Sequence, residues 1–282
     1  MDFIAAIRSE ADGFSSPHTD ATVESSFYAE YKPIVSIGDS DSKVEFQIIG
    51  SPNIYLDLSD SFLYIKLQLL ADRKKIAADK DVSSANNLLH SLFSKVDVHF
   101  NNRIVGSSGN NYAYKAYLES LLSFENYINS QGECPLFCID TDGNKLTIEN
   151  EGHEYRKSLL AKSAQLELID KLRVDIFNQP KYLINDVDVN FSLTRSMNEF
   201  LVKYKPDPLK TAISSVIKLL DANLFVRKQV LNPSLILSHQ KLLENGLDMP
   251  QRKPRSSFSP YLKVILLLLK EMCSSVRFQI AL

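Results

Sequence analysis

The sequence predicts an all-β protein, an antiparallel sandwich or jelly roll with short inserted helices. Two observations lead to this fold class. Apolar and polar residues alternate with period two in five separate stretches, which is the pattern of half-buried strands. Long loops separate these stretches, and no strand–helix–strand rhythm connects them, which argues against a parallel α/β sheet. The alternating stretches are residues 44–48, 63–69, 96–100, 187–193 and 220–226.

The first two predicted strands lie on either side of a turn. In the first, Val44, Phe46 and Ile48 fall on one face, and polar residues fall on the other. Residues 50–53, Gly-Ser-Pro-Asn, are turn formers and end this strand. The second strand runs over residues 62–70, with four aliphatic residues at positions 63, 65, 67 and 69 on its inner face. The charged stretch that follows, residues 72–81, is predicted to be a solvated loop.

Residues 96–122 predict a hairpin followed by a helix. Asn101 and Asn102 tolerate positive φ and suit a two-residue turn between strands 96–100 and 103–105. Asn110 or Asn111 is expected to cap the helix. An apolar stripe at helical spacing is expected to pack against the sheet. Its residues are Tyr114, Tyr117, Leu118, Leu121 and Leu122.

The second half of the chain repeats the strand pattern. We expect a helix within residues 156–162, strands over 166–169, 172–177 and 187–193, and a further strand over 220–226. Residues 203–210 contain two prolines among charges and are typical of an interdomain linker. Asn232 followed by Pro233 predicts the start of a helix, and Asn245-Gly246 predicts its end.

No constellation of reactive residues emerges, so we predict no catalytic residue, no cofactor and no metal. Cys134 and Cys138 are two of the four ligands that a structural zinc site needs, and the interpretation as two half-buried thiols is better. The stretch from Asp140 to Asn144 has the wrong register for a calcium loop and is predicted to be a turn. The five histidines are scattered, and none shares a motif with a nucleophile.

Composition excludes several classes of partner. The formal net charge of −2 provides no overall basic field, and the small basic cluster at 251–255 is predicted to be a solvated loop, so no specific nucleic acid is expected. The longest apolar run, residues 264–269, is far shorter than the roughly 20 residues of a membrane span. The first residues do not resemble a secretory signal. Three cysteines in 282 residues fit a reducing compartment, so an intracellular location is expected.

Four segments resemble a known family, and they occur in the same order as in its members. These are residues 43–70, 86–122, 185–196 and 220–246, and together they resemble the major-capsid-like proteins of Polinton/Maverick elements and related integrated viruses. The resemblance implies a double jelly-roll fold, three chains in each capsomer and a virion built by self-assembly. Members of this family have no catalytic residues, so the resemblance assigns none to this chain. It also implies that the hairpin-and-helix unit of residues 96–122 shapes contacts between subunits.

The resemblance leads to a domain division. We expect an N-terminal arm over residues 1–40, a first jelly roll over 41–203, a linker over 204–210 and the start of a second jelly roll over 211–250. Residues 251–282 lack the alternation and the resemblance, which leads to the hypothesis of a truncated or frameshifted tail. In that case strand 220–226 would lack most of its partners and expose its edges.

Three functions compete at this stage. The first is a structural, capsid-like subunit that acts by self-assembly. The second is a jelly-roll binding module retained in a host genome, which binds protein or carbohydrate, with Tyr112, Tyr114 and Tyr117 as an aromatic patch. The third is an enzyme with metal ligands inside the barrel, and His99 argues against it because it is expected to point away from the apolar face of its strand.

Overall fold

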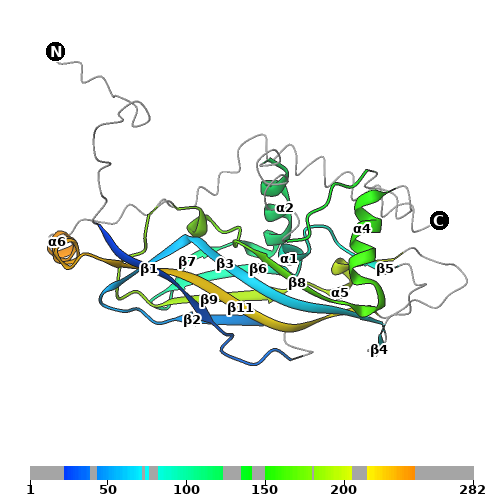
Figure 1. Cartoon of the computed structure of the whole chain (residues 1–282), viewed down its shortest axis with the longest axis horizontal. Helices are drawn as coiled ribbons and strands as arrows, with labels where there is room; N and C mark the ends of the chain where they lie inside the picture. The colour runs from blue at the N-terminus through cyan, green and yellow to red at the C-terminus, as the bar shows by residue number, and fades with distance from the viewer. Residues whose placement is uncertain are drawn as a thin grey trace, which may run out of the picture. The chain divides into compact units, whose positions relative to one another are not determined.

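Figure 1 shows the computed structural model of the chain, which describes residues 22–38, 43–71, 74–75, 82–122, 135–141, 150–179, 181–204 and 215–244. Two antiparallel sheets form its framework. The first sheet has the order β1 (Val23–Tyr31), β11 (Ser215–Leu231), β3 (Ile54–Ala71), with β8 (Gln165–Asp170) and the short β4 (Lys74–Lys75) also paired to β3. The second sheet has the order β2 (Lys43–Ile48), β9 (Val189–Arg195), β6 (Phe93–Phe100), β7 (Arg103–Ser107). A separate pair joins β5 (Val82–Ser84) to β10 (Val202–Tyr204).

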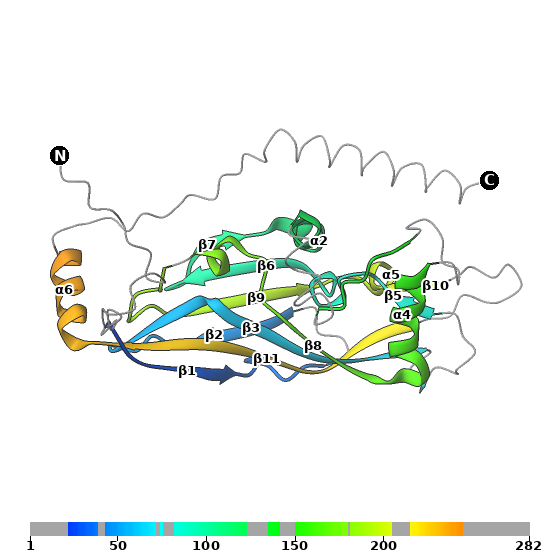
Figure 2. The same ribbon diagram turned by 45° about the horizontal axis from the view of Figure 1, so that its top comes forward.

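The strand pairing has the nested order of a jelly roll. Counted along the described chain without the short β4, β5 and β10, the first strand pairs with the eighth, the second with the seventh and the third with the sixth. The fourth and fifth strands, β6 and β7, form the innermost hairpin. All these pairs are antiparallel, and Figure 2 shows the two sheets as stacked layers. The predicted fold class, an antiparallel jelly roll with short helices, is therefore confirmed.

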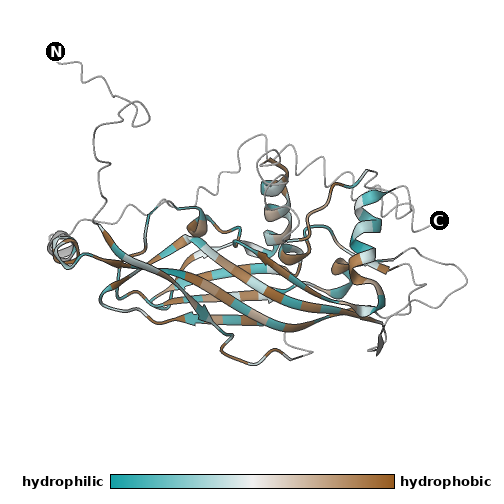
Figure 3. Ribbon diagram, viewed as in Figure 1, coloured by the Kyte–Doolittle hydropathy of each residue, from teal (hydrophilic) through white to brown (hydrophobic). Residues whose placement is uncertain are grey.

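The core lies between the inner faces of the two sheets, because alternation turns every second side chain inward. Figure 3 shows this alternation along β3 and β11. Strand β2 buries Val44, Phe46 and Ile48 and exposes the residues between them, as predicted. The four aliphatic residues predicted for the inner face of β3 are all fully buried. The strand itself begins at Ile54, eight residues before the predicted start.

The predicted turn between β6 and β7 is confirmed. Asn101 and Asn102 have φ values of 46° and 64°, as a turn with two left-handed residues requires. The backbone N–H of Asn101 donates to the carbonyl of Asp188 at 2.9 Å, and the side-chain oxygen of Asn101 accepts from the backbone N–H of Asp188 at 2.9 Å. The hairpin is thereby fixed to the start of β9.

The helices lie outside the two sheets. They are α1 (Leu88–Ser91), α2 (Tyr112–Leu122), α4 (Glu151–Leu160), α5 (Asn198–Leu201) and α6 (Pro233–Glu244). The 3-10 turns are η2 (Gly109–Asn111), η3 (Ala161–Ser163) and η4 (Asp175–Asn178). The predicted start of α6 is confirmed, since the side-chain oxygen of Asn232 accepts from the backbone N–H of Ser234 at 3.0 Å. Helix α4 covers most of the predicted 156–162 segment and begins five residues earlier, where Asn150 caps it through the backbone N–H of His153.

Three local predictions were wrong. Residues 172–177 form no strand, because Leu172, Val174 and Phe177 reach the core from a loop and a 3-10 turn. Asn110 and Asn111 do not cap α2, because they lie inside the turn η2 that leads into it. The buried face of α2 is also different from the predicted stripe. It consists of Tyr112, Ala113, Ala116, Leu118 and Ser120, while Tyr114, Leu121 and Leu122 are exposed.

The strand pairing crosses two of the expected domain boundaries. Strand β1 lies within the predicted arm of residues 1–40 and forms the edge of the first sheet. Strand β11 follows the predicted linker, yet it lies between β1 and β3 in the same sheet. The expectation that strand 220–226 would lack partners was therefore wrong, because β11 closes the jelly roll. Within the charged segment predicted to be a loop, Lys74 and Lys75 form the short strand β4, and the rest of that segment lies outside the described residues. Most of the predicted linker and the whole of residues 251–282 also lie outside them.

Candidate functional site

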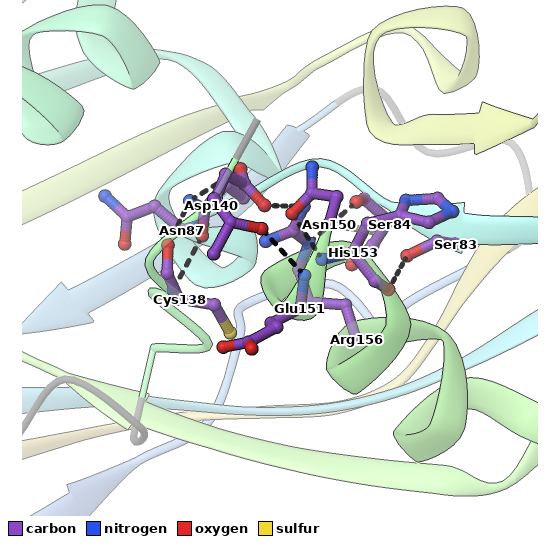
Figure 4. A network of polar contacts seen from close by, with 11 residues as sticks. Ser83, Ser84, Asn87, Cys138, Asp140, Asn150, Glu151, His153 and Arg156 are labelled. Atoms are coloured by element: carbon purple, nitrogen blue, oxygen red, sulfur yellow. Dashed lines mark hydrogen bonds and ion pairs between the residues drawn. The ribbon is translucent and has the colours of Figure 1, made fainter. Parts of the chain in front are cut away.

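A polar network joins α4 to the loop before it and to β5. Figure 4 shows these residues between strand and helix. The guanidinium of Arg156 donates from Nη2 to Asp140 Oδ1 at 2.9 Å and from Nε to the carbonyl of Ser84 at 3.3 Å. The side chain of Asn86 accepts from the backbone N–H of Cys138 at 2.8 Å and donates to its carbonyl at 2.6 Å. These buried and partly buried hydrogen bonds hold the loop against α4.

The backbone of α4 comes very close to this loop at Gly152. A Cβ atom at this position would lie 2.6 Å from the carbonyl oxygen of Ile139 and 2.6 Å from Asp140 Oδ1. Only glycine therefore permits this approach. Arg156 is 4% exposed, so its hydrogen bonds and the close packing at Gly152 hold α4 against the loop. We name Asn86, Cys138, Asp140, Gly152 and Arg156 the clamp.

Replacing Arg156 by Ala is expected to lower the free energy of unfolding by about 1.5–3 kcal/mol, since it removes hydrogen bonds to a charged partner and leaves Asp140 without its cation. Urea titration measures the change. The matched control is Lys157→Ala in the same helix, which removes a more exposed ion pair with Glu154 and is expected to change stability by less than about 0.5 kcal/mol. An equal loss of unfolding free energy in the two variants would contradict the role of Arg156 in the clamp.

A second polar network lies beneath α1 and α2, and its members His90, Tyr112 and Asp170 are buried. His90 Nδ1 lies 2.9 Å from the hydroxyl of Tyr112, and His90 Nε2 lies 2.9 Å from Asp170 Oδ2. The backbone N–H of Arg173 donates to the Tyr112 hydroxyl at 3.2 Å, and Arg173 Nη2 donates to Asp170 Oδ2 at 3.2 Å. Burial lowers the pKa of His90, against the opposite effect of Asp170, and burial raises the pKa of Tyr112. The network joins both helices to the end of β8.

The outer side of α2 and α5 is an exposed apolar surface. Met197, just before α5, is 78% exposed, Leu122 is 71% exposed, and Tyr114 is 51% exposed. The ring of Tyr114 meets the ring of Phe200 edge to face, with 5.8 Å between the centroids. We name Tyr114, Leu121, Leu122 and Met197 the α2 surface. The helical periodicity identified three of these residues, but it predicted the wrong side of the helix as the buried one.

The aromatic patch that a binding module would need does not form. Tyr112 is fully buried in the network with His90, and Tyr117 is partly buried against Phe137, with 5.5 Å between the ring centroids. Tyr114 alone of the three is exposed. The three tyrosines therefore do not form a common surface, and the argument from the sequence for a binding module loses its main support.

A shallow groove of about 280 Å³ lies on the outer face of the second sheet. His99 lines it, so the prediction that this side chain points away from the apolar face is confirmed. Strands β2 and β9 contribute amide, hydroxyl and carboxylate groups, and the hydroxyl of Ser192 donates to Glu45 Oε1 at 3.2 Å. The polar lining residues are Glu45, Gln47, His99, Asn102, Asn190 and Ser192.

Among the residues that the structure describes, the histidines do not converge on a common centre. His90 lies in the buried network, His99 lines the groove, and His239 lies 3.0 Å from the hydroxyl of Tyr55. Within the described ranges, no group of three or more His, Cys, Asp or Glu side chains is placed to hold a metal ion. Cys138 takes part in the clamp, whereas Cys134 and residues 142–144 lie outside the described residues. Among the helices that the structure describes, none has the length and apolar character needed to cross a membrane.

Comparison with known proteins identifies the class of fold. The chain is similar to a chain in the cryo-EM structure of the Sputnik virophage, with 12% identity, 83% of this chain and 53% of that chain covered, and a TM-score of 0.51. It is also similar to the mavirus major capsid protein, with 13% identity, 89% and 54% covered, and a TM-score of 0.45. These neighbours are double jelly-roll major capsid proteins. The likeness to the Sputnik chain supports the jelly-roll fold that the nested strand order defines.

The sequence comparisons are more distant. No family model matches the sequence. The uncharacterized protein F54H12.2 of Caenorhabditis elegans is 23% identical over 169 residues, which are 56% of this chain and 39% of that protein. The chain thus spans about half the length of the capsid chains and less than half the length of this relative.

Proposed function

We propose that the protein is a capsid-like structural subunit that acts by self-assembly, with a homotrimer as its first assembled form. The observation that carries the proposal is the complete nested strand order from β1 to β11, in the arrangement found in viral capsid chains. The origin that we propose is a virus-derived mobile element of the Polinton/Maverick type. An intracellular location, or a virion after assembly, follows from this origin, and neither a specific nucleic acid nor a membrane is a partner in the proposal.

The proposal also includes a revised domain division. The first jelly roll extends from Val23 to Leu231, since β1 and β11 complete its first sheet. A second jelly roll would then begin after Leu231 and not at residue 211. This division takes the place of the boundaries that the sequence led us to expect.

The α2 surface is the proposed contact between subunits. Its four large apolar side chains are 39–78% exposed, and three of them lie on α2, which the hydrogen bond between Tyr112 and His90 fixes to the jelly roll. Exposed apolar patches rimmed by polar residues are typical of protein interfaces. The occupant that we propose is a second copy of the chain, because the similar chain is a component of the Sputnik virophage particle.

Replacing Leu122 by Glu is expected to dissociate the assembled form into monomers, because a buried charge at an interface without a partner costs several kcal/mol. The side chain is 71% exposed in the single chain, so folding should be unchanged. Sedimentation velocity at matched concentrations measures the result. The control is Ile104→Glu on β7, where an apolar residue of similar exposure, 68%, lies on a different surface. Unchanged assembly in Leu122→Glu would exclude the α2 surface as the contact.

The groove on the outer face of the second sheet favours one alternative, a jelly-roll module that binds carbohydrate or protein. Its amide, hydroxyl, imidazole and carboxylate groups are suited to neutral, hydroxyl-rich ligands. Titration of the protein with a glycan panel, with Asn190→Ala as the comparison, tests this alternative. Binding that is lost in the variant would favour the module over the structural subunit.

A further inference from the structure

The histidine beneath α2 occupies a position in which both ring nitrogens have partners. His90 lies on the one-turn helix α1 and has no exposed surface. Its Nδ1 faces the hydroxyl of Tyr112 from α2, and its Nε2 faces a carboxylate oxygen of Asp170 from the end of β8. Three elements that are distant in the sequence therefore meet at one imidazole ring.

The directions of these hydrogen bonds define the protonation state of the ring. A carboxylate only accepts, so Nε2 must carry a hydrogen and donate to Asp170. The oxygen of Tyr112 already accepts from the backbone N–H of Arg173, so its hydroxyl hydrogen is free to donate to Nδ1. Nδ1 is therefore an unprotonated acceptor, and the pattern fits neutral His90 with its hydrogen on Nε2.

A second proton on the ring breaks this pattern. It would occupy Nδ1, so the hydroxyl hydrogen of Tyr112 would lose its acceptor inside a fully buried site. An unsatisfied buried donor costs about 1–3 kcal/mol. The bond lost is the one between α1 and α2, while the bond to Asp170 remains. Acidification therefore weakens the attachment of α2 to α1.

The charges that face His90 come from the surrounding elements. Burial lowers the pKa of His90, Asp170 opposes this by favouring the charged ring, and Arg173 adds a smaller lowering effect. On α2, Glu119 acts on Tyr112 through its charge. The Lys115 ammonium lies 2.5 Å from Asp175 and 3.7 Å from Glu119. On β6, the titratable residues alternate with buried Val96 and Val98 and so belong to the outer face of the sheet. They are Lys95, Asp97 and His99.

We propose that His90, Tyr112 and Asp170 form an acid-sensitive latch that holds α2 against the jelly roll at neutral pH and loosens it on acidification. Because α2 carries the α2 surface, the latch makes that surface dependent on pH, a consequence that rests on the proposed function. The latch itself is a property of the single chain and can be tested without assembly.

The sign of the effect follows from linkage. A histidine in the opened helix has the ordinary pKa of about 6.5, whereas that of His90 in the closed structure is lower. The opened state therefore binds more protons as the pH falls below about 6.5, and opening becomes more favourable. The opening constant is expected to rise by up to about tenfold for each pH unit, until the pKa of the closed form is reached.

The experiment is amide hydrogen exchange of the full chain between pH 7.5 and 5, corrected for the intrinsic effect of pH and performed at a concentration at which the chain is monomeric. The expected result is that residues 112–122 lose protection as the pH falls below 6.5, while β2 and β9 keep theirs. In His90→Gln, the amide can still accept from Tyr112 and donate to Asp170 but does not titrate. Protection of α2 should then be independent of pH. His99→Gln, on the outer face, should behave as the native chain.

Two results would overturn the latch. The first is equal loss of α2 protection in the native chain and in His90→Gln, and the second is full protection of the native chain at pH 5. If His90→Gln does not fold, NMR of the native imidazole nitrogens decides the question. Opening of α2 in step with protonation of Nδ1 supports the latch, and opening while the ring stays neutral contradicts it. A chain that is monomeric at every pH but opens α2 in acid would contradict the proposed function and leave the latch intact.

Discussion

Replacing Phe191 by Ala is expected to lower the free energy of unfolding by about 3–5 kcal/mol. Phe191 lies in the middle of β9, is 1% exposed and packs against Phe177, with 5.3 Å between the ring centroids. Its side chain fills the space between the two sheets, so the smaller residue leaves a cavity. A domain is stable by about 5–15 kcal/mol, so the loss should be visible as a large shift of the urea midpoint.

The control for this experiment is Asn190→Ala, the neighbouring residue on the same strand. Its side chain points to the outer face of the sheet, so the change should stay within about 1 kcal/mol. A small effect of Phe191→Ala together with a large effect of Asn190→Ala would mean that the inner and outer faces of β9 are reversed.

A chain that ends at residue 210 is expected to be unfolded, whereas a chain that ends at residue 244 is expected to keep a cooperative transition. The shorter chain lacks β11, which lies between β1 and β3 in the first sheet. Six buried apolar residues would be lost with it, at about 1.5–3 kcal/mol for each large one, and the sum exceeds the stability of a typical domain. These residues are Ile217, Leu219, Ala222, Leu224, Val226 and Leu231.

Circular dichroism and urea titration of the two chains measure the difference. The comparison distinguishes a first jelly roll that ends at residue 203 from one that extends to Leu231. If the first jelly roll ended at residue 203, the chain of 210 residues would fold and its transition would match that of the longer chain. This outcome would contradict the position of β11 as an inner strand.

The sequence allowed prediction of the strands that have one buried and one exposed face. In β2 and β9, alternation is strict because one face packs in the core, and in β6 it marks the buried Val96 and Val98. The turn at Asn101 and Asn102 was predictable because a chemical requirement, positive φ, selects these residues. Such features depend on neighbouring residues alone.

Strand β1 could not be predicted from periodicity, since it buries almost no side chain. Every one of its nine residues is exposed or partly exposed, and Phe27 and Tyr28 are 45% and 47% exposed. The strand is held by backbone pairing with β11, about 200 residues away in the sequence. Propensity for a strand at an edge is set by its partner, which no local pattern reveals.

The error in α2 has a different cause. A helix with apolar residues on two sides offers two possible buried faces, and the small residues Ala113, Ala116 and Ser120 decide between them by permitting close packing. The role of Tyr112 depends on His90 and Asp170, which come from other elements. The candidate functional surface and the buried network were therefore out of reach of the sequence, because both arise only when distant segments meet.

The measurement that tests the proposed function most directly is the solution mass of the full chain at neutral pH, by light scattering after size exclusion at several concentrations. Self-assembly as a capsid-like subunit predicts a discrete species with three times the mass of one chain. A monomer at every concentration would contradict it, and the groove on the second sheet would then become the first candidate for the function.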